Sequence, residues 1–464
     1  MRLVLAIAAA CLLIAVPASA RSTASGLDWP VFGYDTARHG SAPPSGITTA
    51  NVAKVTRQQV QLDGTVDSSA IYLHGVQVHG ALHDTFFVTT TYGKTEAIDA
   101  STGRLLWRFT PPAYARLAGS AQITTATPAA STDRSAVYAA ASDGRIRKLR
   151  ISDGKVLWTT AITRDPTHEK LTSSLNVSRG LVIATTGGYI GDAPPYQGHV
   201  VTLHESSGRI AHVWNSLCSD RHAIIVPRTC ASSDSAIWSR SGAAVDPSNG
   251  TLVVATGNAP WNGSTDWGDS VIVLSPDASR MLRHWTPTNQ ATLNTTDADL
   301  GSTSPALLPG GYGVQGGKDG ILRLLQLHRL PGVNARTGGE LQSLPAPGPT
   351  DVFSEPAVWN GTWVFVSTSA GTEGLLFKGG RLHPAWSNST GGTSPALSGG
   401  LLFVAGSGSV HVYLPASGRE IATLPSGTVH WQSPIIADGR VAVAEGNANA
   451  HATTGVLDIY RAPR

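Results

Sequence analysis

A short phrase that returns eight times constrains the fold more than any other feature of this sequence. The phrase joins a small polar residue to Pro or another small residue and continues into an apolar strand. Its returns span residues 67–73, 125–131, 172–178, 240–246, 303–309, 354–359, 393–398 and 432–437. Each unit, roughly 40 to 70 residues long, has the alternating pattern of about four short strands. Such units predict a β-propeller, here with eight blades.

A second phrase marks the outer side of a unit, with a polar residue, a turn, a basic residue, apolar residues and Trp. It reads AIDASTGRLLWRF at 97–109, LRISDGKVLWTT at 149–160, LHESSGRIAHVW at 203–214 and LSPDASRMLRHW at 274–285. Short turns with Gly or Asp join antiparallel strands. The Trp is expected to pack between neighbouring sheets.

The two ends of the chain predict how the ring closes. Residues 55–62 form one strand before the first unit, and the last unit, 430–461, has about three strands. An N-terminal strand that joins the C-terminal blade completes the eighth blade and removes exposed sheet edges. We therefore expect an all-β, eight-bladed β-propeller of four-stranded blades, with residues 21–464 as a single domain.

Residues 1–20 are predicted to be a signal peptide. Arg2 precedes an apolar run over residues 3–16, and residues 18–20 read ASA, the small-x-small form of a cleavage site. The run is shorter than the ~20 residues that a transmembrane helix needs. We therefore expect an exported protein, periplasmic or extracellular, without a membrane span.

Two cysteines remain after removal of that segment, Cys218 and Cys230. In an oxidising compartment a disulfide between them is the default prediction. A zinc pair is the weaker alternative, because no His–His or Cys–Cys partner motif accompanies them.

Charge and short motifs exclude several classes of function. The formal net charge is only +3 and no basic cluster occurs, so we expect no nucleic-acid partner. GxSxG and P-loop motifs are absent from the sequence, and no GxGxxG motif leads from a strand into a helix, which leaves hydrolase, NTPase and nicotinamide functions without support. We expect a monomer.

Residues 234–303 form the densest polar stretch. They include Trp238 in AIWSRSG, Asn258 in ATGNAPWN, and Asp297 and Asp299 in TDADLGST. Lys318 follows in the next unit, in GGKDGILRLL. Each of these residues also has a purely structural interpretation. The Trp can pack between blades, the Asn can stabilise a turn, the acids can cap backbone amides or stay solvated, and the Lys can stay solvated.

The repeated phrases resemble the pyrroloquinoline quinone (PQQ) repeat, and DWPVFGYD…TTANVAKV resembles the opening of quinoprotein alcohol dehydrogenases. The resemblance runs through the whole chain after residue 20 and implies an eight-bladed propeller. The same blades build PQQ-dependent dehydrogenases and cofactor-free propellers, including the lipoprotein of the outer-membrane barrel assembly machinery.

The resemblance also implies roles for the polar residues. Trp238 matches the floor under the quinone, Asn258 a calcium ligand, and Lys318 a hydrogen-bond donor to the quinone. Asp299 matches the catalytic base, with Asp297 as second choice, and is also expected to be a ligand of the Ca²⁺. A flat aromatic stacks on a flat cofactor, oxygen ligands hold Ca²⁺, and a carboxylate serves as general base.

Three departures from the family pattern stand beside these matches. Tyr189, in TTGGYIGDAPPYQGHVV, takes the place of a second acidic calcium ligand, with Asp192 nearby. The disulfide between adjacent cysteines that covers the quinone has no counterpart. The Arg expected in the second blade, as partner of a quinone carboxylate, does not occur in ITTATPAAS.

Three functions follow as hypotheses. The first is a PQQ- and Ca²⁺-dependent dehydrogenase whose small-molecule substrate is an alcohol or sugar. The second is a non-catalytic propeller that binds a protein or glycan partner. The third is an enzyme with a different site at the channel mouth near Trp431, which precedes the last inner-strand phrase and is expected to contact a bound ligand there or to form the rim.

Overall fold

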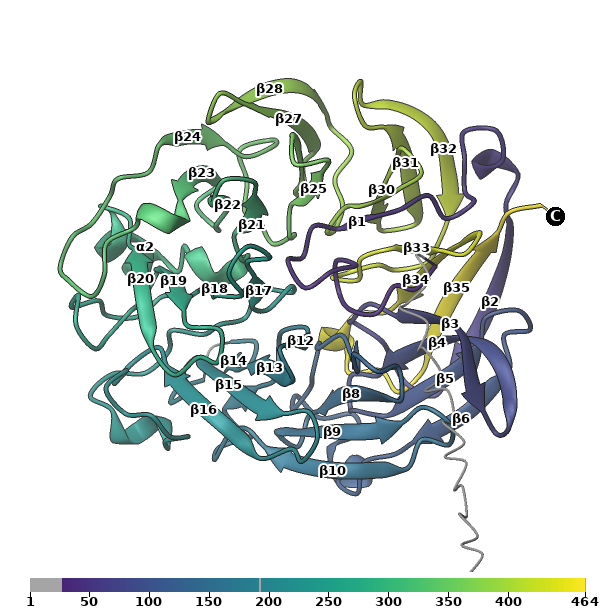
Figure 1. Cartoon of the computed structure of the whole chain (residues 1–464), viewed down its shortest axis with the longest axis horizontal. Helices are drawn as coiled ribbons and strands as arrows, with labels where there is room; N and C mark the ends of the chain where they lie inside the picture. Colours follow the sequence, from purple (N-terminus) through teal and green to yellow (C-terminus); the bar gives the residue numbers. More distant parts are fainter. Residues whose placement is uncertain (1–26, 192, 464) are drawn as a thin grey trace, which may run out of the picture.

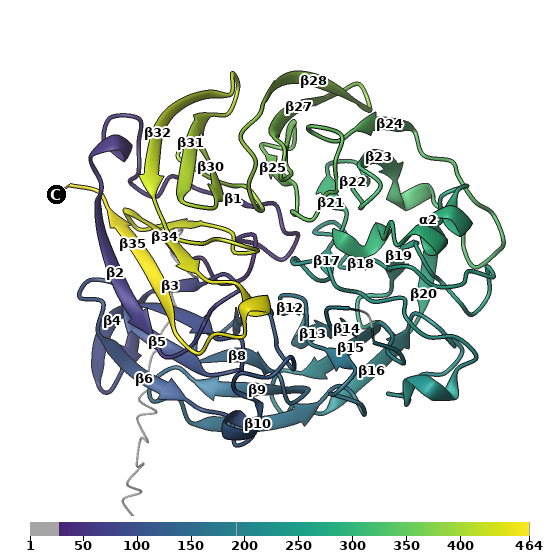
Figure 2. The same cartoon turned by 180° about the vertical axis from the view of Figure 1, so that it is seen from behind.

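Eight antiparallel sheets stand around a central axis and form a ring (Figure 1; Figure 2). The computed structural model describes residues 27–191 and 193–463, so the predicted signal peptide, residues 1–20, lies outside the described residues, as does Asp192. The eight-bladed, all-β prediction is confirmed, whereas the single-domain organisation stays a prediction.

The first four blades each run from an inner to an outer strand in chain order. Their strands are β3 (Ile71–Val78), β4 (Ala81–Thr89), β5 (Thr95–Asp99) and β6 (Leu105–Phe109); β7 (Ala129–Ala130), β8 (Ala136–Ala141), β9 (Arg145–Arg150) and β10 (Val156–Ala161); β12 (Asn176–Ser178), β13 (Leu181–Thr185), β15 (His199–His204) and β16 (Ile210–Asn215); and β17 (Ala244–Val245), β18 (Leu252–Ala255), β19 (Val271–Leu274) and β20 (Met281–Trp285).

Blades five to seven follow the same order, and blade eight combines the two ends of the chain. Their strands are β21 (Ala306–Leu308), β22 (Tyr312–Gln315), β23 (Ile321–Gln326) and β24 (Gln342–Pro345); β25 (Ala357–Trp359), β26 (Trp363–Ser367), β27 (Thr372–Lys378) and β28 (Arg381–Asn388); β29 (Ala396–Ser398), β30 (Leu401–Gly406), β31 (Ser409–Leu414) and β32 (Arg419–Pro425); and β33 (Ile435–Ala437), β34 (Arg440–Glu445), β35 (Gly455–Arg461) and β2 (Thr56–Leu62).

Short elements lie beside the four-stranded blades, within their loops or between them. They are β1 (Ser41–Ala42), β11 (Glu169–Lys170), β14 (Gly187–Gly188), α1 (Tyr114–Leu117), α2 (Gln290–Thr296), η1 (Val52–Lys54), η2 (Pro227–Thr229), η3 (Leu300–Ser302), η4 (Leu327–Arg329) and η5 (Ala448–Ala450). One of them, β1, adds a parallel fifth strand to blade seven through β29. Among the described residues, no helix has the length and apolar character needed to cross a membrane.

Ring closure occurs as predicted. Strand β2 pairs antiparallel with β35 along its whole length, from Thr56 opposite Arg461 to Leu62 opposite Gly455. One apolar cluster spans blades seven, eight and one, with Phe403, Ile459 and Phe86 among its buried members. The first and last parts of the chain therefore share one core.

The small residues of the inner-strand phrase let the blades converge. Their hydroxyls join neighbouring blades: the Ser433 N–H donates to Ser69 Oγ at 2.8 Å, and the Glu355 N–H donates to Ser394 Oγ at 2.9 Å. Such contacts give buried backbone N–H groups a hydrogen-bond partner, which larger apolar side chains at these positions would not provide.

The outer-strand Trp contacts the turn of the next blade. Trp107 Nε1 donates to the Ile151 carbonyl at 2.7 Å, and its ring covers Gly154, where a Cβ would lie 2.6 Å from the indole. The same arrangement recurs for Trp158 with Gly208 and for Trp386 with Gly418. The turn glycine is thus required both by its positive φ and by the neighbouring indole.

Residues 28–46 form an N-terminal strap along the inner strands, which Figure 1 shows in purple running across the ring to β1. Backbone carbonyls of the strap accept hydrogen bonds from inner strands of six blades: Trp29 from Tyr72, Pro30 from Ala130, Thr36 from Val245, His39 from Val358, Gly40 from Leu397 and Ser45 from Gly439, just beyond β33. Arg38, buried at 1% exposure, donates to the Phe32 and Leu175 carbonyls. The strap therefore fills one end of the channel.

Candidate functional site

A cavity of about 260 Å³, here called the central cavity, lies where the inner strands begin. Its lining comes from five blades and their loops: Lys170, Thr172, Gly188, Tyr189, Ile190, Gly191, Tyr196, Ala236, Trp238, Arg240, Asp299, Lys318, Phe353, Trp431 and Asn449. Because most of these residues precede inner strands that the strap contacts further along, the cavity belongs to the mouth away from the strap.

Four residues that the sequence singled out line this one cavity: Trp238, Asp299, Lys318 and Trp431. Lys318 Nζ lies 2.7 Å from Asp299 Oδ2 and 5.5 Å from the centroid of the Trp238 ring. These contacts bring together residues from blade four, from the loop before blade five and from the β22–β23 turn. Their roles toward a cofactor stay predictions.

Asn258 contacts the Asp299 carboxylate through its backbone. Its N–H donates to Asp299 Oδ1 at 2.6 Å, while the residue itself does not line the central cavity. Asn258 therefore fixes the Asp299 carboxylate, and its predicted role as a metal ligand stays untested.

The two candidate acids differ in position. Asp299 is 5% exposed, and burial raises its pKa, an effect that the nearby Lys318 charge opposes. Asp297 pairs with the same ammonium at 2.8 Å, but its side chain is 60% exposed and it does not line the cavity. The geometry favours Asp299 over Asp297 as the group that faces a substrate.

A further carboxyl group, Asp269, lies behind Asp299 and was missed from the sequence. Burial and the charge of Asp299 raise the pKa of Asp269 to about 8. It accepts a hydrogen bond from the Leu300 N–H at 3.2 Å. Asp269 lies in the same polar stretch, residues 234–303, but outside the motifs singled out in it, so only the folded structure places it beside Asp299.

Two cations that sequence reasoning missed also line the cavity. Burial and the charge of Arg240 lower the pKa of Lys170 to about 7, and burial lowers the pKa of Arg240 to about 10. The Arg240 Nη1 donates to Thr125 Oγ1 at 2.8 Å. The second blade therefore supplies a threonine that holds an arginine of the fourth blade. Arg240 lies within AIWSRSG, two residues after Trp238, so the signal was in the motif itself.

Three of the aromatic rings that line the cavity, those of Trp238, Phe353 and Trp431, lie close together. Phe353 lies 5.9 Å from Trp238 and 5.1 Å from Trp431 between ring centroids. The Arg240 guanidinium lies 4.2 Å from the Trp431 ring centroid, a cation–π distance. Cations thus lie against flat aromatic surfaces, an arrangement suited to a planar anion.

Tyr189 and the cysteines occupy separate positions. Tyr189 lines the central cavity and donates its hydroxyl to the Pro166 carbonyl at 2.8 Å, and burial raises its pKa, so the phenol is neutral. Cys218 and Cys230 form a disulfide, which confirms their predicted pairing, and neither lines the cavity.

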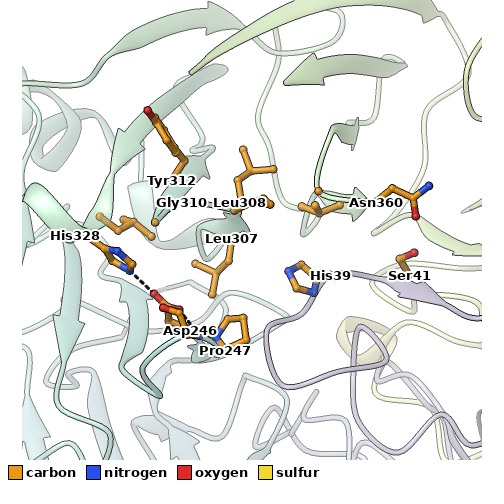
Figure 3. A pocket seen from close by; sticks show the side chains of 16 residues that line it. His39, Ser41, Asp246, Pro247, Leu307, Leu308, Gly310, Tyr312, His328 and Asn360 are labelled. Atoms are coloured by element: carbon orange, nitrogen blue, oxygen red, sulfur yellow. Dashed lines mark hydrogen bonds and ion pairs between the residues drawn. The ribbon is translucent and has the colours of Figure 1, made fainter. Parts of the chain in front are cut away.

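A larger cavity of about 580 Å³ lies beside the strap, at the ends of the inner strands (Figure 3). Asp246 accepts from His328 Nε2 and Ser248 Oγ at 2.6 Å each, and Leu307, Leu308 and Tyr312 are among the apolar residues around them. Ser248 and His328 therefore both bond to the Asp246 carboxylate instead of to each other. This arrangement does not form a serine nucleophile activated by histidine.

Fold and cavity together define an eight-bladed β-propeller with a cationic, aromatic cavity at one channel mouth. The family model described as outer membrane protein assembly factor BamB matches residues 52–222. The quinone-type alcohol dehydrogenase subunit of Gluconobacter oxydans is 22% identical over 56% of this chain and 38% of its own length. The quinohemoprotein alcohol dehydrogenase ADH IIB of Pseudomonas putida is 24% identical over 56% of this chain and 40% of its own. This chain thus spans well under half the length of these curated relatives.

Solved structures are similar across nearly the whole chain. A quinohemoprotein alcohol dehydrogenase from Comamonas testosteroni superimposes with a TM-score of 0.69 at 18% identity, over 96% of this chain and 83% of that one. BamB from Moraxella catarrhalis gives 0.54 at 13% identity, over 88% and 98%. At these identities the solved structures establish the fold alone. Together with the sequence matches, they make this chain a β-propeller that is similar to PQQ-repeat proteins and to quinoprotein alcohol dehydrogenases.

Proposed function

We propose that the central cavity binds PQQ and that this protein is an exported dehydrogenase of alcohols or sugars. The observation that carries the proposal is the meeting of Trp238, Asp299 and Lys318 in one cavity. The sequence relatives, named as quinone-type alcohol dehydrogenases, and the disulfide, typical of oxidising compartments, support it further.

The lining fits a flat, polycarboxylate quinone. Among the lining residues that the structure describes, Lys170, Arg240 and Lys318 provide three cations, against Asp299 as the one acid. Trp238 and Trp431 offer faces for stacking. Arg240 supplies the cation that the second blade lacks, because its guanidinium reaches Thr125 of that blade.

The lining does not fit Ca²⁺ equally well. Calcium takes six to eight oxygen ligands, several of them carboxylates. The cavity offers Asp299, whose oxygens already receive Lys318 and the Asn258 N–H, and a neutral Tyr189 in place of the second acid. We therefore propose quinone binding in which Lys318, rather than a divalent ion, supplies the positive charge beside Asp299.

Asp299 is the proposed general base. A bound quinone supplies the acceptor for the hydride that leaves the alcohol carbon. The Asp299 carboxylate takes the hydroxyl proton, and the carbonyl product forms. The Lys318 charge favours the ionised carboxylate against the effect of burial, and the Asn258 N–H holds its other oxygen in place.

The substitution Asp299→Asn tests this role. We expect PQQ binding to persist and dye-linked alcohol oxidation to fall at least about 100-fold, because only the base is removed. Asp297→Asn, which changes the exposed partner of the same lysine, should keep activity within about twofold.

Equal losses in both variants would contradict the assignment of Asp299 as base. Saturable PQQ binding without oxidation of any alcohol or sugar by the unmodified protein would contradict the dehydrogenase function and leave a non-catalytic propeller.

A further inference from the structure

A second cavity of about 350 Å³, here called the side cavity, adjoins the central cavity at the same mouth. It lies over blades six, seven and eight and is lined by Asp351, Phe353, Ser354, Ser367, Thr368, Ser369, Gly391, Gly392, Thr393, Ser394, Gly406, Ser407, Val429, His430 and Trp431. Phe353 and Trp431 line both cavities and so form their common wall.

Two of the hydroxyl groups that line the side cavity already donate their protons to backbone carbonyls. Thr368 Oγ1 donates to the Pro347 carbonyl at 2.8 Å, and Thr393 Oγ1 donates to the Gln432 carbonyl at 2.6 Å. These oxygens consequently present lone pairs as acceptors. A wall of hydrogen-bond acceptors suits a ligand that brings many O–H donors.

Asp351 adds a carboxylate without a partner. Among the residues that the structure describes, its half-buried side chain has no hydrogen bond or ion pair. A carboxylate has two oxygens and can accept hydrogen bonds from two adjacent hydroxyls at once. Such bonds are stronger than those between neutral groups, so a vicinal diol is a favourable partner for Asp351.

The common wall provides the apolar complement. The rings of Phe353 and Trp431 lie 5.1 Å apart between centroids, nearly perpendicular at 63°, and His430 packs on Trp431 at 4.4 Å. The C–H face of a sugar ring packs well on an exposed aromatic face, while its hydroxyls point to the polar wall. A simple alkanol would use the aromatic face but leave the acceptors and Asp351 unpaired, which is costly.

We propose that the side cavity binds a saccharide or a polyol through Asp351, the acceptor hydroxyls and the Phe353–Trp431 wall. This saccharide site rests on the proposed function and assigns its substrate class. The hydroxyl group that is oxidised beside Asp299 belongs to a polyhydroxylated molecule, and the rest of that molecule occupies the side cavity.

Binding to the quinone-free protein tests the proposal directly. Glucose, maltose and sorbitol are titrated while tryptophan fluorescence is followed, with 1-butanol as the apolar comparison. We expect saturable binding of at least one polyhydroxylated probe, at least about tenfold tighter than 1-butanol. Asp351→Asn should weaken that binding at least about tenfold, as expected for loss of hydrogen bonds to a charged acceptor.

The control is Asp297→Asn, an exposed acid outside the side cavity, which should leave the sugar affinity within twofold. In Asp351→Asn the PQQ affinity and the melting temperature should also stay unchanged. Binding of 1-butanol as tight as that of the sugars, no binding of any sugar, or an unchanged affinity in Asp351→Asn would overturn the proposal. Sugar binding with no PQQ binding would refute the proposed dehydrogenase while leaving the saccharide site in place.

Discussion

At the scale of single residues, the buried cations decide what the central cavity can hold. Lys170 and Arg240 are 4% and 8% exposed. The free-energy cost of burying each positive charge falls only where a negative group lies nearby. An anion in the cavity would restore the charge of Lys170. The same residue therefore makes binding depend on pH.

Lys170 gives a prediction about that dependence. Its pKa of about 7 in the free protein means that it is charged below pH 7 and largely neutral above it. A bound anion raises this pKa, so PQQ affinity should be constant below pH 7 and fall above it, by up to about tenfold per pH unit. Equilibrium titrations between pH 5 and 9 measure the trend.

Lys170→Met is the matched variant for this prediction. It should bind PQQ more weakly at pH 6 and show no fall between pH 7 and 9. An affinity that falls equally in both proteins would show that another group carries the pH dependence.

At the scale of elements, the turn between outer strands links neighbouring blades. Gly154 has φ of +72° and lies under the Trp107 indole of the preceding blade. An added methyl group needs both a strained backbone and displacement of a buried ring. The outer-strand phrase is consequently a blade-to-blade contact as well as a hairpin.

Gly154→Ala and Gly180→Ala separate these two costs. Gly180 has φ of +76° with open space around it, so its substitution costs only the backbone strain. We expect Gly154→Ala to lower the free energy of unfolding by about 1–3 kcal/mol more than Gly180→Ala does. Urea denaturation measures both, and equal losses would contradict the packing role of Trp107.

At the scale of the whole molecule, the sequence predicted the ring better than the site. Repeats and the split eighth blade follow from local patterns, since each strand and turn is encoded within its own unit. Trp238, Asp299 and Lys318 were singled out because their motifs resemble those of quinoprotein dehydrogenases in order, and the structure places all three in one cavity. Arg240 stands in the AIWSRSG motif, but its contact with Thr125 of the second blade and its place beside Lys170 in one cavity appear only in the folded ring.

The central claim is that the central cavity binds PQQ through its own cations. Titration of PQQ into EDTA-treated protein, followed by tryptophan fluorescence and by melting temperature, tests it most directly. The account predicts saturable one-to-one binding with stabilisation of about 2.7 kcal/mol at a free PQQ concentration of 100 Kd. Added Ca²⁺ should change the affinity less than about twofold. No binding, or binding that appears only with Ca²⁺, would contradict it.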